Sequence, residues 1–265
     1  MFISWLLTFV VHIPVILAAK NAKRGLAFAD GANTGGVDVK KADTTNSVVS
    51  WQYNWGSTPP DYLAKSSIPF IPMQWGAGGI ENFAALVKAQ GAKTMLGFNE
   101  PDLAGQSNIN ATYAAALWKK YINPLSASSV RLGAPAVSSA PGGRPWLAAF
   151  LAACSGCKID FIPFHWYGTG AQNFIDYIGQ MHSQFPNYPL WVTEFASTSM
   201  NDTGKFPLLT KQVLNFLVST TTHMDTLDWI EGYSWFGFFR RESGSAYSLL
   251  DANGGLNALG TNYII

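Results

Sequence analysis

Two of the five glutamates in this 265-residue sequence follow runs of apolar residues. Glu100 ends the segment TMLGFNE, and Glu194 lies in LWVTEFA. A charged carboxylate is costly in an apolar run unless it is paired or reaches an open surface. Two carboxylates that converge on one bond could carry out glycoside hydrolysis, in which a protonated acid serves the leaving oxygen and an ionised carboxylate attacks or activates water. We therefore predict that Glu100 and Glu194 form a catalytic pair; the alternative for each is an ion pair at a strand end.

Polar residues near these carboxylates could bind a sugar. Asn99 precedes Glu100 and could hydrogen-bond the hydroxyl next to the reacting carbon. His165 and Tyr167 alternate along one predicted strand and so share a face. The Tyr167 hydroxyl could keep a nucleophile ionised, whereas His165 could equally be a core imidazole bonded to the backbone. Asp102 is expected to cap the turn into the next helix.

Large aromatic rings collect at the ends of the predicted strands. Flat rings stack on the C–H faces of sugars and release ordered water when covered. A single tryptophan is more often a core residue, but several on one rim predict a sugar-binding cleft. Trp235 is the expected platform under the sugar at the cleavage point. The rings expected at this rim are Trp51, Trp55, Trp75, Trp166, Trp235 and Phe236.

Composition and motifs argue against several other kinds of site. A net charge of +1 with 12% charged residues leaves no electrostatic footprint for nucleic acid. No histidine has ligand spacing, and the sequence lacks GxGxxG, GxxxxGK[ST] and GxSxG, so we expect no metal and no cofactor. Cys154 and Cys157 could form a redox motif, half of a metal site or a local disulfide. In an oxidising compartment, and without a second cysteine pair, the disulfide is favoured.

The carboxylates would have to be positioned by eight strands that alternate with helices. Near-continuous apolar runs are typical of parallel strands covered on both faces. The predicted strands are Arg24–Ala29, Val48–Trp55, Ile68–Trp75, Thr94–Asn99, Arg131–Val137, Ile159–Trp166, Leu190–Phe195 and Gly232–Phe238. The clearest helical patterns between them are Ile80–Gln90, Thr112–Leu125, Pro145–Ala153, Ala171–Phe185 and Phe206–Thr222, with fainter ones at Val37–Asp43 and Leu256–Tyr263.

Eight such units in about 250 residues predict an α/β protein with a single-domain TIM (β/α)8 barrel. An open doubly wound sheet is the alternative, but it usually carries a glycine-rich phosphate turn after its first strand. In a barrel, Glu100 and Glu194 would end the fourth and seventh strands and face each other across the catalytic mouth.

Residues 1–19 predict a secretory signal peptide, which leaves residues 20–265 as the catalytic domain. The apolar stretch that ends at Ala19 is short and interrupted for a membrane span, although an uncleaved signal anchor is the alternative. Asn110 and Asn201 lie in Asn-X-Thr triplets that accept N-glycans in secreted proteins. We expect a secreted monomer, free or associated with the cell wall, with no membrane attachment after cleavage.

Four segments together resemble fungal glycoside hydrolase family 128, the alkali-sensitive-linkage type of glycosyl hydrolase catalytic core. The resemblance covers essentially the whole chain from Lys23 onward, and the pair of glutamate motifs is its most specific part. The segments are GFNEPD (97–102), CSGCKID (154–160), FHWY (164–167) and WVTEF (191–195).

This resemblance implies a TIM barrel that cleaves internal β-1,3-glucan bonds with net retention and without a cofactor. Matched by position, Glu100 resembles the acid/base, Glu194 the nucleophile and Asn99 the residue that binds the neighbouring hydroxyl. The further substrate-binding residues implied are His165, Tyr167 and Trp235.

We therefore expect a secreted endo-β-1,3-glucanase whose partner is a β-1,3-glucan polysaccharide or oligosaccharide. A lectin-like wall protein that binds glucan without cutting it is an alternative, and it would keep the aromatic rim while being free to lose one carboxylate. A glucan transglycosylase is another, because it would form the same covalent intermediate and differ by lengthening its products.

Overall fold

The computed structural model describes residues 19–29, 35–198, 209–241 and 246–265. Residues 1–18 of the predicted signal peptide and the predicted glycan acceptor Asn201 lie outside these ranges. In the part of the chain that is described, no helix combines the length and apolar character needed to cross a membrane.

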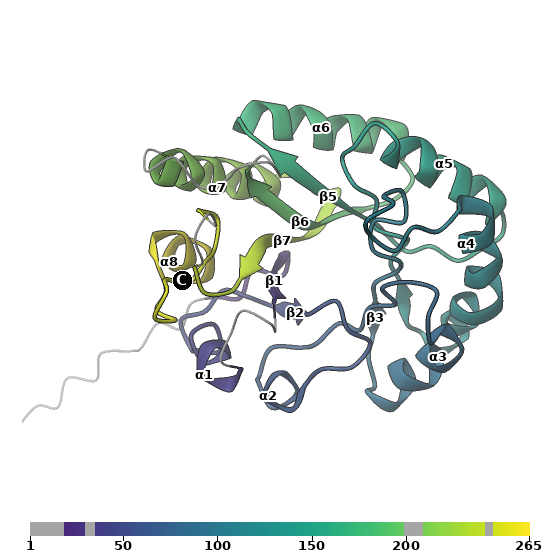
Figure 1. Cartoon of the computed structure of the whole chain (residues 1–265), viewed down its shortest axis with the longest axis horizontal. Coiled ribbons are helices and arrows are strands. Elements are labelled where there is room, and N and C mark those ends of the chain that lie inside the picture. Colours follow the sequence, from purple (N-terminus) through teal and green to yellow (C-terminus); the bar gives the residue numbers. More distant parts are fainter. Residues whose placement is uncertain (1–18, 30–34, 199–208, 242–245) are drawn as a thin grey trace, which may run out of the picture.

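Parallel pairings join the strands into a closed barrel that the helices surround (Figure 1). Five strands pair in the order β2-β1-β7-β6-β5, and β3 pairs with β4. Single parallel bridges close the remaining gaps, from Gln52 to Phe70, from Met73 to Leu96 and from Gly133 to Phe161. The strands are β1 (Arg24–Phe28), β2 (Trp51–Tyr53), β3 (Thr94–Met95), β4 (Arg131–Leu132), β5 (Ile162–Gly168), β6 (Leu190–Ser197) and β7 (Ile230–Phe238).

The barrel is less regular on one side than the sequence predicts. The predicted strand Ile68–Trp75 is not a continuous strand and pairs only through bridges at Phe70 and Met73. Pro69 and Pro72 explain the difference, because proline has no N–H to donate to a ladder. β4 is likewise cut to two residues before Pro135.

The helices follow the predicted periodicity closely. α3 (Ile80–Ala89) buries Ile80, Phe83 and Val87 against the barrel. α4 (Ala111–Leu117) is shorter than predicted, because the chain continues as a π-helical turn and then as a 3₁₀ turn with Pro124 near its start. The remaining helices are α1 (Gly36–Val39), α2 (Asp61–Ala64), α5 (Gly143–Ala153), α6 (Ala171–Gln184), α7 (Leu209–Asp225) and α8 (Ala258–Ile264).

Aromatic rings fill the barrel interior, where they rest on glycines of neighbouring strands. Trp51 and Trp191 lie with ring centroids 5.0 Å apart. A Cβ added at Gly25 would come within 2.2 Å of the Trp51 ring, and one at Gly232 within 2.5 Å of the Trp191 ring. Only glycine leaves room for these rings, so the glycines of the strands determine where the rings pack in the interior.

Two predicted covalent features lie on the outside of the barrel. Cys154 and Cys157 form a disulfide at the end of α5, which confirms that prediction. Asn110 is exposed and caps α4, its Oδ1 accepting a hydrogen bond from the Thr112 backbone N–H at 3.0 Å.

Candidate active site

Glu100 and Glu194 meet at one end of the barrel on either side of His165. The Nδ1 atom of His165 lies 2.9 Å from Oε1 of Glu100, and its Nε2 atom lies 3.4 Å from Oε1 of Glu194. One oxygen of each carboxylate and one nitrogen of His165 all lie within 4.8 Å of one another. The two glutamates are 7% and 6% exposed, so the predicted convergence takes place in a nearly closed site.

The backbone around Glu194 is irregular, and this irregularity aims its side chain. Glu194 pairs with His165 of β5, and the register of β6 shifts beside it on both neighbouring strands. Such bulges redirect side chains and are common next to active sites. The carbonyl oxygen of Thr193, one residue earlier, accepts hydrogen bonds from the Tyr53 hydroxyl at 2.8 Å and from the Ser234 hydroxyl. The segment that carries Glu194 is therefore fixed from two strands.

Glu100 is held in an unusual backbone conformation. Its φ is +39°, in the left-handed region that non-glycine residues rarely adopt. The backbone N–H of Glu100 donates to the carbonyl of Ala136 at 2.7 Å, and this bond ties it to the next strand position. Trp55, on the other side of the mouth, also has a positive φ, of 64°. Strain of this kind concentrates at functional sites, where the surrounding structure enforces it.

Both oxygens of Glu194 accept hydrogen bonds from uncharged donors. The indole N–H of Trp55 donates to Oε1 at 2.7 Å, and the Tyr167 hydroxyl donates to Oε2 at 2.5 Å. Burial raises the pKa of Tyr167 well above its usual value, and the adjacent charge of Glu194 raises it further. Tyr167 therefore stays protonated and keeps donating. The two donors fix both oxygens of Glu194 in place.

His165 is placed to carry positive charge between the two carboxylates. Its burial lowers the pKa of the imidazole, but the charge of Glu194 and then the hydrogen bond with Glu100 raise it, and the net pKa is above the ordinary value of 6.5. His165 is 1% exposed and lies beneath the two glutamates as their shared partner.

Asn99 lies beside Glu100 with part of its amide unsatisfied. Its Nδ2 donates to Oε1 of Gln106 at 3.1 Å, whereas its buried Oδ1 has no partner among the described residues. Asp102 does not cap the next helix as predicted. It accepts instead from the backbone N–H of Ser138 at 3.0 Å, so it joins two loops of the mouth.

These groups border a cavity of about 470 Å³. Predicted site residues in its lining are Trp75, Asn99, Glu100, Tyr167 and Glu194. The cavity also includes Trp55 and Phe236, which the sequence predicted as rings of the aromatic rim. Three further lining residues, for which the sequence predicted no substrate-binding role, are Gln106, Thr198 and Tyr247. For Trp55 and Phe236, the only sequence feature that indicated a binding role was an aromatic ring near a strand end. Gln106 and Tyr247 lie in loops without periodicity, so no sequence pattern indicated a role for them.

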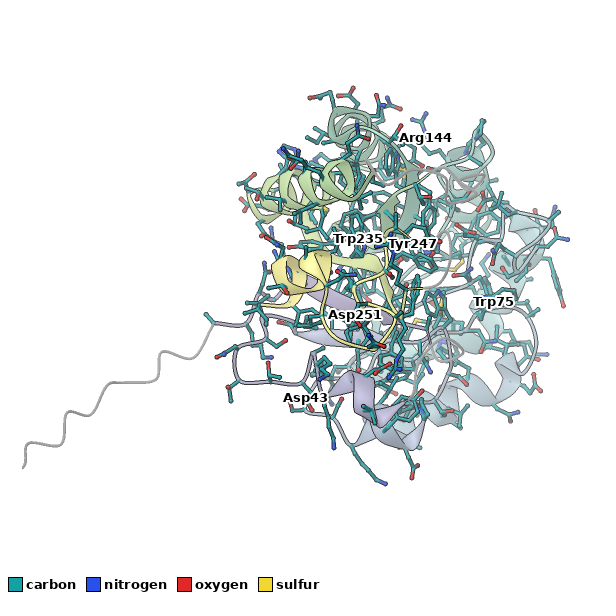
Figure 2. The ribbon with its side chains drawn as sticks, turned by 60° about the vertical axis from the view of Figure 1, so that its left-hand side comes forward. Asp43, Trp75, Arg144, Trp235, Tyr247 and Asp251 are labelled. Carbon is teal, nitrogen blue, oxygen red and sulfur yellow. A yellow bond between two sulfur atoms is a disulfide. The ribbon has the colours of Figure 1, made fainter. Side chains whose placement is uncertain are left out.

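Trp235 is not the predicted platform, because it is fully buried. Its ring packs edge-on against Phe195 with centroids 5.2 Å apart. Its indole N–H donates to the carbonyl of Tyr247 at 2.6 Å, and Figure 2 shows these two residues close to each other. Residues alternate across a strand, so Phe236 faces the cavity when Trp235 faces the helices. The Phe236 ring meets that of Tyr167 at 5.5 Å.

Two other predicted rim tryptophans are also core residues. Trp166 is 6% exposed and stacks on Phe216 of α7 with centroids 5.5 Å apart, so it points away from the cavity. Trp51 is 4% exposed and belongs to the aromatic filling of the barrel interior. Of the tryptophans predicted at the rim, Trp55 and Trp75 line the cavity, and Trp75 is 41% exposed.

The carboxylates and His165 could in principle offer three ligand atoms to a cation. Their existing contacts favour acid–base chemistry instead. Both oxygens of Glu194 face N–H or O–H donors, whereas a cation requires lone pairs directed at it.

Comparisons with known proteins agree with this arrangement. The family described as glycosyl hydrolase catalytic core matches residues 25–263. Alkali-sensitive linkage protein 1 of Schizosaccharomyces pombe is 36% identical over 252 residues, which are 92% of this chain. They are only 44% of that relative, so the chain spans less than half of its length.

Solved structures of glycoside hydrolase family 128 are similar over nearly their whole length. A curdlan-specific exo-β-1,3-glucanase from Blastomyces gilchristii, in complex with glucose, is 33% identical with a TM-score of 0.75, over 91% of this chain and 97% of that one. An endo-β-1,3-glucanase from Amycolatopsis mediterranei, in complex with laminaritriose, is 31% identical with a TM-score of 0.73, over 92% and 98%. These matches confirm the predicted fold and the predicted family resemblance.

Proposed function

This chain belongs to the glycosyl hydrolase catalytic core family, and from that premise we propose that it is a secreted enzyme that cleaves internal bonds of β-1,3-glucan with retention. The observation that carries the reaction type is the pair of carboxylates in one cavity, with one oxygen of each within 4.8 Å of the other. Retaining glycosidases hold their carboxyl groups about 5–5.5 Å apart, whereas inverting ones need about 6.5–9.5 Å to admit a water molecule. The close approach supports a double displacement.

In the first step, the Glu194 carboxylate attacks the anomeric carbon while protonated Glu100 gives its proton to the departing glycosidic oxygen. The bond from the anomeric carbon to that oxygen breaks, and an ester to Glu194 forms. Trp55 and Tyr167 fix both oxygens of the nucleophile before the attack. The contact of His165 with Oε1 of Glu100 leaves Oε2 to carry the transferred proton.

In the second step, Glu100 is a carboxylate and takes a proton from a water molecule that attacks the anomeric carbon. The ester bond to Glu194 breaks, and the starting protonation states return. The unsatisfied Oδ1 of Asn99 is available to a hydroxyl next to the reacting carbon, where hydrogen bonds strengthen as positive charge develops.

The proposed substrate rests on the relatives and on the lining of the cavity. The two solved structures described above are of proteins named as β-1,3-glucanases, and they hold glucose or laminaritriose. The rings of Trp55, Trp75, Phe236 and Tyr247 around the carboxylates suit the apolar faces of glucosyl units. A binding protein would not need both glutamates in one cavity, which favours an enzyme over a lectin-like protein.

Secretion is proposed on the disulfide and on the exposed acceptor asparagine. Disulfides persist in oxidising compartments, and Cys154–Cys157 is formed. Asn110 lies exposed at the start of α4, where a glycan would not disturb the core.

The test is product analysis on linear β-1,3-glucan, with Glu194→Gln as the control. We expect a series of oligosaccharides early in the reaction, with the β-anomer formed first by proton NMR, and no turnover in the variant. Glucose as the sole early product would refute internal cleavage, and the α-anomer first would refute retention. Products longer than the substrate would indicate a transglycosylase, and binding without new reducing ends would indicate a lectin-like protein.

A further inference from the structure

The chain leaves the barrel ladder at Glu100, and the carboxylate of Asp102 completes the ladder in its place. Up to this point the pairing is regular, since the N–H of Ala136 donates to the carbonyl of Phe98 at 2.8 Å and the N–H of Glu100 donates to the carbonyl of Ala136 at 2.7 Å. The next bond of a parallel ladder would run from the N–H of Ser138 to the carbonyl of Glu100. That N–H donates instead to Oδ1 of Asp102 at 3.0 Å.

The carbonyl of Glu100 is thereby free to close a turn. It accepts from the N–H of Leu103 at 3.0 Å, and Pro101 occupies the second position of this turn, which its fixed φ suits. Glu100 could not take its φ of +39° inside a regular parallel strand, where φ is about −120°. Ser138 is 6% exposed, and without Asp102 its N–H would be buried with no acceptor.

The link between Asp102 and Ser138 uses both carboxylate oxygens and is closely packed. The Ser138 hydroxyl donates to Oδ2 of Asp102 and accepts from the backbone N–H of Ala140 at 3.1 Å. Gly143 of α5 lies against both residues, because a Cβ added there would lie 2.1 Å from the carbonyl oxygen of Ser138 and 3.4 Å from Oδ2 of Asp102. A carboxylate with a donor on each oxygen holds a fixed orientation, so the link is rigid.

Residues 136–138 also position His165, the partner of the Glu100 carboxyl group. The carbonyl of Val137 accepts from the backbone N–H of His165 at 2.9 Å. The Nδ1 atom of His165 lies 2.9 Å from Oε1 of Glu100. Because Asp102 ties the turn after Glu100 to this same segment, the acid and its imidazole partner share one support.

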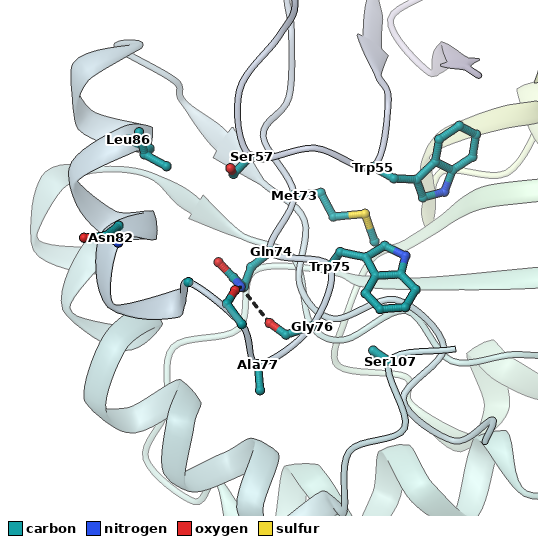
Figure 3. A pocket seen from close by; sticks show the side chains of 12 residues that line it. Trp55, Ser57, Met73, Gln74, Trp75, Gly76, Ala77, Asn82, Leu86 and Ser107 are labelled. Carbon is teal, nitrogen blue, oxygen red and sulfur yellow. Dashed lines mark hydrogen bonds between the residues drawn. The ribbon is translucent and has the colours of Figure 1, made fainter. Parts of the chain in front are cut away.

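The backbone of Asn99 is held independently of this link. Its N–H donates to the carbonyl of Trp75 at 2.8 Å, and its carbonyl accepts from the N–H of Ser107 at 3.3 Å. Both of these partners border a neighbouring cavity (Figure 3). Loss of the Asp102 link should therefore displace Glu100 while Asn99, the proposed contact to the neighbouring hydroxyl, stays in place.

We infer that Asp102 is a positioning residue for the acid/base Glu100. Its carboxylate takes the place of the Glu100 carbonyl in the ladder, and this exchange lets Glu100 leave the strand with its carboxyl group directed at His165 and into the catalytic cavity. Asp102 is not among the described residues that line that cavity, so it acts through Glu100. The inference rests on the proposed function, because it concerns the acid of that reaction.

The test uses two substrates to separate proton transfer from binding and folding. Laminarihexaose has a leaving group that must be protonated, whereas the 2,4-dinitrophenyl glycoside of laminaritriose releases a phenolate that departs without a proton. For both, kcat/KM reports the first displacement. Asp102→Leu removes both acceptors but keeps a side chain of similar shape. Asp160→Leu is the matched control, because Oδ2 of Asp160 likewise accepts a backbone N–H, from Leu132 at 2.8 Å, near the starts of the strands.

We expect Asp102→Leu to lower kcat/KM on laminarihexaose about ten- to a hundredfold, through kcat rather than KM, and to leave the dinitrophenyl glycoside nearly unaffected. Asp160→Leu should change neither ratio. Asp102→Asn keeps an acceptor for the Ser138 N–H, so it should retain most of the wild-type activity on both substrates.

An equal loss on both substrates in Asp102→Leu, or an equal loss on laminarihexaose in Asp160→Leu, would show a general effect on the fold, and the inference would be wrong. It would also be wrong if Asp102→Leu kept its activity on laminarihexaose, or if Asp102→Asn lost as much as Asp102→Leu. The enzyme proposal itself would fail on different results: a wild type that turns over neither substrate, or a Glu100→Gln variant that keeps its activity on laminarihexaose.

Discussion

Removing the Tyr167 hydroxyl should lower kcat/KM on β-1,3-glucan. The hydroxyl donates to Oε2 of Glu194 at 2.5 Å, and the carboxylate is 6% exposed, so little solvent is present to replace the bond. A hydrogen bond to a charged group contributes about 1.5–3 kcal/mol. Because this bond holds the nucleophile in place, and a factor of ten in rate corresponds to about 1.36 kcal/mol, Tyr167→Phe should lower kcat/KM about ten- to a hundredfold.

The assay is kcat/KM on a soluble β-1,3-glucan at one fixed pH, because this ratio reports the stabilisation of the transition state relative to free enzyme and substrate. Tyr177→Phe is the matched control, because it removes a hydroxyl whose contact is the carbonyl of Ser138 at 3.5 Å. The Phe ring at position 167 keeps the edge contact with Phe236. An unchanged kcat/KM in Tyr167→Phe, or an equal loss in Tyr177→Phe, would refute the role of Tyr167 in holding the nucleophile Glu194.

Three further predictions concern the groups around the carboxylates and the disulfide. Tyr53→Phe removes a donor to the buried Thr193 carbonyl. We expect the free energy of unfolding, measured with urea, to fall by about 1–3 kcal/mol. We also expect kcat to fall by a larger factor than KM changes. The pKa of His165 is raised above 6.5, so its stabilising effect is fully present below that pH and is lost as the pH rises through the raised pKa. The Tm of the wild type should therefore fall relative to His165→Gln over that interval, and parallel curves would contradict this. Replacing Cys154 and Cys157 by serine opens a short loop. The free energy of unfolding, measured by chemical denaturation, should fall by about 2 kcal/mol, while kcat is unchanged.

The sequence was sufficient to predict the barrel and the convergence of Glu100 and Glu194, because both depend on strand order. Eight apolar runs alternating with helices leave few topologies, and the carboxyl ends of parallel strands lie at one end of a barrel. Glu100 and Glu194 therefore had to lie near each other once the strands were counted correctly. The segment predicted as the third strand still takes its place in the barrel, although prolines interrupt it, because single bridges at Phe70 and Met73 pair it with its neighbours.

Strand order does not predict whether an individual ring points toward the cavity or toward the helices. A parallel strand is covered on both faces, so β7 is buried along most of its length, and its adjacent rings carry no alternation that would reveal its phase. Trp235 and Phe236 are equally good candidates in such a run, and the larger ring lies on the helix side. Trp166 on β5 was misplaced for the same reason.

The irregular side of the barrel is also the side from which the catalytic cavity takes its tryptophans. Regular ladders would hold Trp55 and Trp75 in an alternating pattern, with every second side chain in the interior. Instead Trp55 has a positive φ, and Trp75 ends a segment that pairs only through single bridges. The two indoles can therefore both border the catalytic cavity. The glycine-seated rings below the mouth supply the rigid packing that such departures require. On the proposed function, the same departures from a regular ladder create the surface on which a glucan chain is bound.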